Sequence, residues 1–375
     1  MTEENDGLEG VVAAHTVLSE VDGAEGRLVI RGLTLDEIAQ HWRFEDVVAL
    51  LFKGFFDTLP GNNAALRSAL GRARREAFER LQPNDDAVLR RMPPIEAVRA
   101  LLARLPDGDD LPTALRLVAA PAVYTAAVMR WRLGVQALAP DEALPHAVDM
   151  LRMLHGRTPT AAQGAALDTY LVTVCDHGLN ASTFAARVVA STGAGLASAV
   201  LAGISALKGP LHGGAPGPVL DALDAIGTAA NARTWLEGAV ASGQRLMGFG
   251  HRIYRVRDPR ADALKGALNR LSAEGSVNAA RFELAEATEQ AALAILREKK
   301  PGRALETNVE FYTALLLEAL GFGRESFTCV FAAGRVSGWV AHAREQVQKG
   351  RLIRPQSVYV GPAPEAAIDE AALAH

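Results

Sequence analysis

Apolar residues recur three and four positions apart along most of the chain, and this spacing predicts a protein built almost entirely of α-helices. The chain has 375 residues, 49% of them hydrophobic and 22% charged, which is enough to bury a large core. Ala, Leu, Arg and Glu dominate these segments, as expected from their high helix propensity. Helices are predicted over Leu35–Trp42, Glu45–Phe52, Asn63–Arg80, Ile95–Leu105, Leu111–Arg132, Ala143–Leu154, Ala161–Asp176, Pro218–Ile226, Ala261–Ser272, Phe282–Lys299 and Glu306–Leu320.

Strand-like sequence occurs in one place, near the N-terminus. Thr16–Leu18 and Leu28–Ile30 flank the turn-forming stretch Asp22–Gly26, a pattern that predicts one short β-hairpin. No comparable pattern recurs further along the chain. The expected fold class is therefore all-α with a single short N-terminal hairpin.

One uncharged stretch, Val188–Leu207, has about the length of a bilayer span. Its Ser, Thr and Gly residues, and the hydrophilic candidate site residues near both of its ends, favour a buried helix in a soluble protein. The first residues of the chain are acidic and lack the apolar segment of a signal peptide. We therefore expect a cytoplasmic protein that does not cross a membrane.

Charge and cysteine content narrow the class of partner. The formal net charge is −4, from 39 basic and 43 acidic residues without long runs of either sign, so a small-molecule substrate is favoured over nucleic acid or an anionic membrane. Only Cys175 and Cys329 are present, which argues against a disulfide framework or a cysteine-rich zinc site. The GxGxxG, GxxxxGK[ST] and GxSxG motifs are absent, which weakens dinucleotide, P-loop and serine-hydrolase functions.

Three histidines lie in loops where packing does not require them. They are His177 in CDHGLNAST, His212 in KGPLHGGAPGP and His251 in GFGHRIYRVRDPR. With Glu310 in TNVEFY they supply an acid, a base and polar anchors from distant segments, as an active site requires. The remaining histidines lack such a setting and are expected to be surface or core residues: His15, His41, His146, His155, His342 and His375.

The residue types around these histidines indicate chemistry on an anionic substrate. Glycines beside His212 allow close approach of a ligand, and a neutral imidazole near a helix N-terminus can donate a hydrogen bond to an oxygen that gains negative charge. Arginines crowd the segment after His251 and suit a carboxylate or phosphate, since a guanidinium donates two parallel hydrogen bonds. Glu310 is a candidate general base. A metal site is disfavoured because no HExxH or similar short ligand spacing is present.

In combination these segments resemble a citrate synthase of the short bacterial type over nearly the whole chain. The resemblance rests on GLEGVVAAHTVLSEVDGAEGRLVIRG, DHGLNASTFAARVVAST, LKGPLHGGA, GFGHRIYRVRDPRA, TNVEFYTALLLEALG and RLIRPQSVYVG, in the order of that family. It implies a two-domain helical fold, with a large dimer-forming domain over residues 1–211 and 317–375 and a small mobile domain over 212–316. It also implies a homodimer in which Arg354 reaches the active site of the partner subunit.

The resemblance implies an acyltransferase that joins the methyl carbon of acetyl-CoA to the ketone of oxaloacetate and hydrolyses the thioester, giving citrate and CoA. Glu310 matches the catalytic base, His212 the hydrogen-bond donor to the thioester oxygen, and His251 the histidine that polarises the ketone. The residues that match substrate-binding positions are His177, Arg260, Arg335 and Arg354.

Coenzyme A is expected as a thioester co-substrate, with no tightly bound cofactor and no metal. Its binding is expected to use the backbone at Gly248, Phe249 and Gly250 together with Asn308, and its phosphates have nearby cations in Lys299, Lys300 and Arg303.

The chain departs from the family at the base, where the usual Asn-Val-Asp is Asn308-Val309-Glu310. The added methylene moves the carboxylate by roughly 1 Å, and a displacement of that size can cost about a hundredfold in rate. Three functions remain open: condensation of acetyl-CoA with oxaloacetate, a 2-methylcitrate synthase-like reaction of propionyl-CoA or another acyl-CoA/2-oxo acid pair, and a weakly catalytic CoA-binding scaffold. Retention of all three histidines and three arginines argues against the scaffold.

Overall fold

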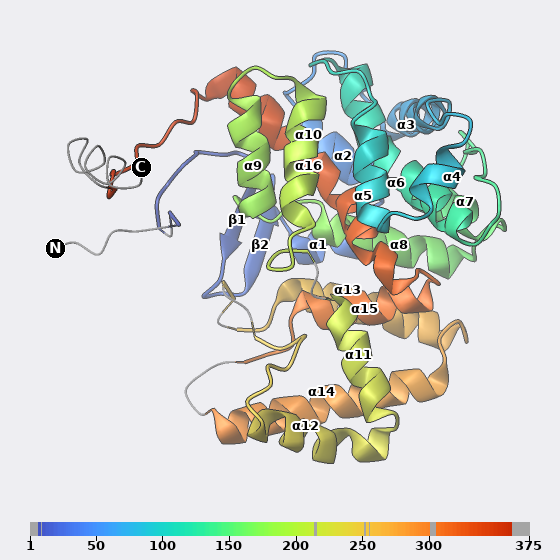
Figure 1. Ribbon diagram of the computed structural model, residues 1–375, viewed down its shortest axis with the longest axis vertical. Helices are drawn as coiled ribbons and strands as arrows, with labels where there is room; N and C mark the ends of the chain where they lie inside the picture. Colours follow the sequence, from blue (N-terminus) through green and yellow to red (C-terminus); the bar gives the residue numbers. More distant parts are fainter. Residues whose placement is uncertain are drawn as a thin grey trace, which may run out of the picture.

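The computed structural model describes residues 7–8, 10–213, 216–250, 253–254, 256–300 and 305–361. Helices dominate these ranges and strands form one small sheet (Figure 1), so the predicted all-α class is confirmed. The helices are α1 (Leu35–Ala39), α2 (Phe44–Phe52), α3 (Asn63–Phe78), α4 (Asp85–Leu89), α5 (Pro94–Leu102), α6 (Leu111–Arg132), α7 (His146–His155), α8 (Ala161–Val174), α9 (Ala181–Ala190), α10 (Leu196–Leu207), α11 (Pro216–Ile226), η1 (Ala229–Asn231), α12 (Ala232–Ala241), α13 (Pro259–Ala273), α14 (Ala279–Lys299), α15 (Val309–Ala319), η2 (Arg324–Ser326) and α16 (Phe327–Lys349).

The sheet has three short antiparallel strands in the order β1 (Ser19–Asp22), β2 (Arg27–Ile30) and β3 (Leu33–Thr34). The predicted hairpin is confirmed, but its first strand lies three residues later than expected. The cause is the turn, because the Asp22 carboxylate accepts hydrogen bonds from the backbone N–H groups of Ala24 and Glu25 and so ends the strand at Asp22.

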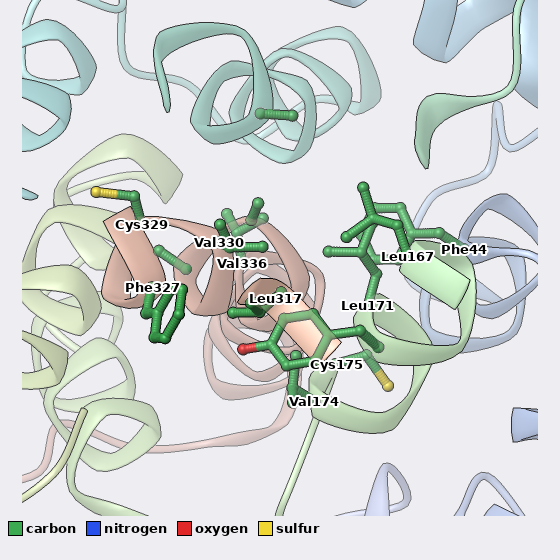
Figure 2. Packing of buried hydrophobic residues seen from close by; sticks show 14 of the residues in the cluster. Phe44, Leu167, Leu171, Val174, Cys175, Leu317, Phe327, Cys329, Val330 and Val336 are labelled. Carbon is green, nitrogen blue, oxygen red and sulfur yellow. The ribbon is translucent and has the colours of Figure 1, made fainter. Parts of the chain in front are cut away.

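Helices α1 to α10 and α16 form the upper part of the molecule in Figure 1. The core of this part lies around α6, α8 and α16. Figure 2 shows Leu171 and Val174 of α8 packed near Val330 and Val336 of α16, with Leu317 of α15 beside them. Within the described residues α6 is the one helix long and apolar enough to span a membrane by length and composition, and 89% of its apolar window is buried inside the protein. Such burial is typical of a core helix.

The uncharged stretch Val188–Leu207 forms two helices, so the prediction of one continuous buried helix is wrong. The chain turns between α9 and α10, and Gly195 adopts a φ of +93° that an L side chain rarely adopts. The Asp107 carboxylate then accepts hydrogen bonds from the N–H groups of Ala197 and Ser198, at 2.7 and 3.0 Å. A new helix therefore begins at Leu196.

Helices α11 to α15 lie together in the lower part of the molecule (Figure 1). Of these, α13 packs against α8 of the upper part and α15 packs against α13. The candidate site lies at this junction, where segments from both parts approach one another.

Candidate active site

One pocket of about 350 Å³ collects most of the predicted site residues. Those that line it are His177, His212, Gly248, Phe249, Gly250, Arg260, Asn308, Glu310 and Arg335. His251 lies outside the described residues, as do Arg252, Arg255 and Arg303. Arg354 is exposed on the C-terminal segment and is not among the lining residues. Residues scattered over more than 150 positions of the chain thus face one cavity.

Glu310 lies in the first turn of α15, and Asn308 caps that helix. The Asn308 side chain accepts a hydrogen bond from the Glu310 N–H at 3.0 Å and donates one to the Gly250 carbonyl at 2.7 Å. Backbone hydrogen bonds also join the two segments, from Gly250 N–H to Glu306 O at 2.8 Å and from Asn308 N–H to Gly248 O at 2.9 Å. The candidate base and the glycine loop are therefore held in a fixed relation.

The Glu310 carboxylate accepts no hydrogen bond from the part of the chain that the structure describes. Burial raises its pKa to about 7, against the opposing effect of the Arg260 and Arg335 guanidinium groups. A carboxylate that titrates near neutral pH and lines a pocket without a partner suits general base catalysis.

His212 lies in the turn between α10 and α11, and its Nε2 is 2.9 Å from the Ser182 hydroxyl. Burial, with a further contribution from the Arg335 charge, lowers the pKa of His212 to about 4. The imidazole is therefore neutral at pH 7. The sequence predicted a neutral His212 from the nearby helix N-terminus, but the main cause in the structure is burial.

The tautomer of His212 depends on the direction in which the Ser182 hydroxyl donates its proton. The hydroxyl accepts a hydrogen bond from Trp339 Nε1 at 3.1 Å, and its single proton has two possible acceptors, Asn180 Oδ1 at 2.7 Å and His212 Nε2. When that proton goes to His212, the imidazole proton resides on Nδ1, which then can donate to a ligand.

Arg335 is a buried cation without a carboxylate partner among the described residues. Its side chain is 1% exposed, and its Nε donates to the Val174 carbonyl at 2.6 Å. Burial, with a contribution from the neighbouring Arg260 charge, lowers its pKa to about 10. An uncompensated buried charge is costly, and a guanidinium is suited to hold a carboxylate by two hydrogen bonds. The pocket is therefore prepared for an anion.

Arg260 is held by Asp258, which sequence reasoning did not single out. Asp258 accepts from Arg260 Nε at 3.0 Å and Nη2 at 2.8 Å, and also from the backbone N–H of Val309 at 3.1 Å. One buried carboxylate thus fixes an arginine of the pocket and the residue before Glu310 relative to each other.

His177 is buried in the turn between α8 and α9, and its Nε2 lies 3.1 Å from the Tyr254 hydroxyl. The Tyr254 ring lies below the Arg260 guanidinium, with 5.6 Å from Cζ to the ring centroid. Asn180 and Ser182 follow His177 in one motif, so that motif was a usable signal for them. Tyr254 and Asp258 likewise lie in the GFGHRIYRVRDPRA motif, but nothing in that motif indicates their partners His177 and Val309.

Other groups that sequence reasoning missed complete the pocket wall. Arg245, Leu246, Met247, Ile253 and Phe331 line it beside the predicted residues. Among the residues that the structure describes, no group of three or more His, Cys, Asp or Glu side chains is arranged to hold a metal ion.

The comparisons with known proteins assign the family. Residues 7–356 match the family profile described as "Citrate synthase, C-terminal domain". The chain belongs to the citrate synthase family. It is 39% identical to putative citrate synthase 2 of Mycobacterium tuberculosis H37Rv, over 96% of this chain and 93% of that protein. It is 36% identical to 2-methylcitrate synthase of the same strain, over 95% and 90% of the two chains.

A solved citrate synthase of the archaeon Thermoplasma acidophilum, in a ternary complex with carboxymethyl coenzyme A and oxaloacetate, matches this fold with a TM-score of 0.82. The two sequences are 29% identical, and the match covers 95% of this chain and 96% of the archaeal chain. The predicted family and its transferase class are thereby confirmed.

Proposed function

We propose that this citrate synthase family member condenses an acyl-CoA with oxaloacetate and hydrolyses the product thioester, with acetyl-CoA giving citrate as the leading reaction. The observation that carries the proposal is the buried Arg335, which has no carboxylate partner among the described residues, in a pocket that also holds Arg260, His212 and Glu310. Oxaloacetate brings two carboxylates and an electrophilic ketone to such a pocket.

The first chemical step moves a proton from the carbon next to the thioester carbonyl to the Glu310 carboxylate. The C–H electron pair then forms the enolate, whose oxygen accepts a hydrogen bond from neutral His212. A neutral imidazole suits this step because it is a far weaker acid than an imidazolium. It therefore stabilises the enolate oxygen by a hydrogen bond and keeps its own proton.

In the second step the enolate carbon attacks the ketone carbon of oxaloacetate, and the ketone oxygen takes up a proton. By family resemblance His251 donates a hydrogen bond to that oxygen and polarises the ketone. His177, Arg260 and Arg335 bind the oxaloacetate. Water then adds its hydroxyl to the acyl carbon, and the thiolate leaves as CoA after taking a proton.

A second cavity of about 560 Å³ adjoins the pocket and supports CoA binding there. The two cavities share Arg245, Leu246, Phe249 and Gly250, and the second also reaches Lys300. We assign the thioester arm to the backbone of the glycine loop and the phosphates to Arg245 and Lys300, since both cations lie at the cavity wall.

We also propose a homodimer in which Arg354 completes the active site of the partner subunit. The segment before it is anchored to its own subunit, because Arg351 O accepts from Gln346 Nε2 at 2.8 Å and the Ile353 N–H donates to the Ser191 hydroxyl at 3.0 Å. Arg354 itself is exposed beyond these anchors. Residues 212–316 are proposed as the mobile domain that closes over the substrates.

A second candidate reaction uses propionyl-CoA and gives 2-methylcitrate. It is favoured by the similarity to a 2-methylcitrate synthase and by the longer base, since Glu310 alters the space beside the acyl carbon.

Thiol release tests both reactions. The purified protein is assayed with acetyl-CoA or propionyl-CoA and oxaloacetate, and the products are identified by mass spectrometry. The proposal predicts thiol release that Glu310→Gln lowers by about a thousandfold or more, since the base is lost. Absence of thiol release with both donors contradicts the proposal, and equal activity of Glu310→Gln contradicts the base assignment.

A further inference from the structure

His342 is a buried histidine to which the proposed function gives no task. It lies on α16 on the same face as Arg335 and Trp339, because the spacings of seven and three residues return to one side of a helix. Arg335 itself lines the pocket, and Trp339 donates to the Ser182 hydroxyl that contacts His212. His342 is 0% exposed.

The hydrogen bonds of His342 define its tautomer. Its Nδ1 lies 2.8 Å from Arg187 Nη1, and a guanidinium can only donate, so Nδ1 accepts. The ring proton therefore resides on Nε2, which lies 3.2 Å from both carboxylate oxygens of Asp176. His342 thus bridges a buried cation and a buried anion.

Asp176 holds the chain on both sides of the candidate substrate ligand His177. Its carboxylate accepts from the Ser19 hydroxyl at 2.5 Å, and that hydroxyl oxygen accepts from the Gly178 N–H at 3.0 Å. The residues before and after His177 are therefore tied to one carboxylate. Burial alone would raise the pKa of Asp176, but the His342 and Ser19 contacts lower it below its usual value, so the carboxylate is ionised.

A glycine on α16 permits this close approach. A Cβ at Gly338 would lie 2.3 Å from the Cys175 carbonyl oxygen and 3.1 Å from Asp176 Oδ1. The helix therefore presents His342 to the turn before His177 with no side chain between the two backbones at that point.

Arg187, the cation bound to His342 Nδ1, has further partners of its own. Arg187 donates from Nη1 to Glu345 Oε2 at 2.7 Å and from Nε to Gln346 Oε1 at 3.0 Å. Glu345 also accepts from the Val17 N–H at 2.9 Å. Arg187 thus keeps a carboxylate partner if His342 is replaced, whereas Asp176 loses its imidazole donor.

We propose that His342 is a positioning residue that orients the turn bearing His177 for binding of the dicarboxylate substrate. It acts through Asp176 and touches neither substrate nor a reacting atom. The proposal rests on the proposed function, in which His177 binds oxaloacetate. Glu310 and His212 have their own supports in Asn308 and Ser182, so the effect falls mainly on the 2-oxo acid and less on the acyl-CoA.

Two substitutions separate positioning from simple packing. In His342→Gln the side-chain amide takes the place of Nε2 and can still donate to Asp176. In His342→Asn the amide takes the place of Nδ1, where its oxygen accepts from Arg187 but nothing reaches Asp176. Both variants remove the buried ring, so each serves as the stability control of the other.

The measurements are the KM values for oxaloacetate and acyl-CoA, kcat, the melting temperature, and the Kd of oxaloacetate by calorimetry. We expect His342→Asn to raise the oxaloacetate KM and Kd by about tenfold, as expected for loss of a buried hydrogen bond, with the acyl-CoA KM within about twofold of the parent. His342→Gln is expected to restore most of the oxaloacetate affinity.

Equal oxaloacetate Kd values in the two variants overturn the proposal, and so does a parallel loss of both KM values, kcat and melting temperature. A parent protein that binds oxaloacetate but releases no thiol contradicts the proposed function alone. In that case the Kd values of the two variants still decide the role of His342. A parent protein that binds no oxaloacetate overturns both.

Discussion

The hydroxyl of Ser182 lies 2.9 Å from Nε2 of His212, on the opposite side of the ring from Nδ1. The hydroxyl is buried with Trp339 and Asn180 as its other partners. A small polar side chain in the first turn of α9 thus orients a histidine thirty residues further along the chain. His212, the donor assigned to the thioester oxygen, therefore depends on the Ser182 hydroxyl, which does not line the pocket.

Ser182→Ala is therefore predicted to lower kcat by about tenfold, because His212 loses the hydroxyl contact that orients its ring. The KM for oxaloacetate is expected to change little. Steady-state kinetics check this, with Ser205→Ala in α10 as the matched serine control. A kcat equal to that of the parent would show that Ser182 does not influence His212.

The rate of the free enzyme is predicted to rise with pH through about 7. Glu310 must be ionised to accept a proton, and its pKa is raised to about 7 by burial, so the active form is lost as the pH falls through that value. His212 is already neutral above pH 5 because its pKa is near 4, so it adds no second limb near neutrality. The check is a kcat/KM profile from pH 5 to 9, which should be flat above pH 8.

Glu310→Asp is predicted to lower kcat, by about a hundredfold, because the carboxylate withdraws by roughly 1 Å. The backbone at this point is held by Asn308 and Asp258, so it does not follow the shorter side chain. Rates with acetyl-CoA and propionyl-CoA test the prediction. A gain in rate on this substitution would mean that Glu310 is a handicap in a site shaped for aspartate.

Arg335→Met is predicted to abolish oxaloacetate binding without lowering the melting temperature of the free protein. The native guanidinium is buried without a carboxylate partner among the described residues, so its removal relieves an uncompensated charge. The parent should gain melting temperature on addition of oxaloacetate, whereas the variant should not. A variant that still gains melting temperature would place the anion elsewhere. Arg72→Met, at an exposed position of α3, is the control.

Asp168 is predicted to make the protein less stable as the pH rises from about 4 to 7. Burial, with the Glu45 charge as a second cause, raises its pKa to about 7, so the folded protein holds a proton that the unfolded chain has released. The free energy of unfolding should fall by about 4 kcal/mol over this range, since one pKa unit corresponds to about 1.4 kcal/mol. Asp168→Asn should flatten the dependence, since its amide oxygen can still accept from the Phe44 N–H. Urea denaturation at pH 4 and 8 measures both.

Elements with strong helical periodicity and clear end signals could be predicted from the sequence, and α6 agrees with its prediction at both ends. Both ends carry local signals, with Asp110 as N-cap followed by Pro112 and basic residues in the last turn. In contrast α16 was missed, because its aromatic and β-branched residues and two glycines weaken the periodic signal. Burial against α6, α8 and α9 makes it a helix, and that packing is not a local property.

The site shows the same division. Residues that carry chemistry in recognisable motifs, such as His212 in its glycine-rich loop and Glu310 in TNVEFY, were identifiable from their local sequence. Asp258 and Tyr254 were not, because their importance comes from partners that only the fold brings near, Val309 in one case and His177 in the other. The shift in the pKa of Glu310 likewise arises from burial, which a sequence does not display.

The central claim is that Glu310 removes a proton from the acyl carbon of the thioester. Its most direct test is exchange of the acetyl-CoA methyl protons with deuterated water, followed by mass spectrometry, in the presence of malate, which offers the carboxylates of oxaloacetate without its ketone. The account predicts exchange by the parent protein and none above background by Glu310→Gln. Exchange at the same rate in both proteins would contradict it.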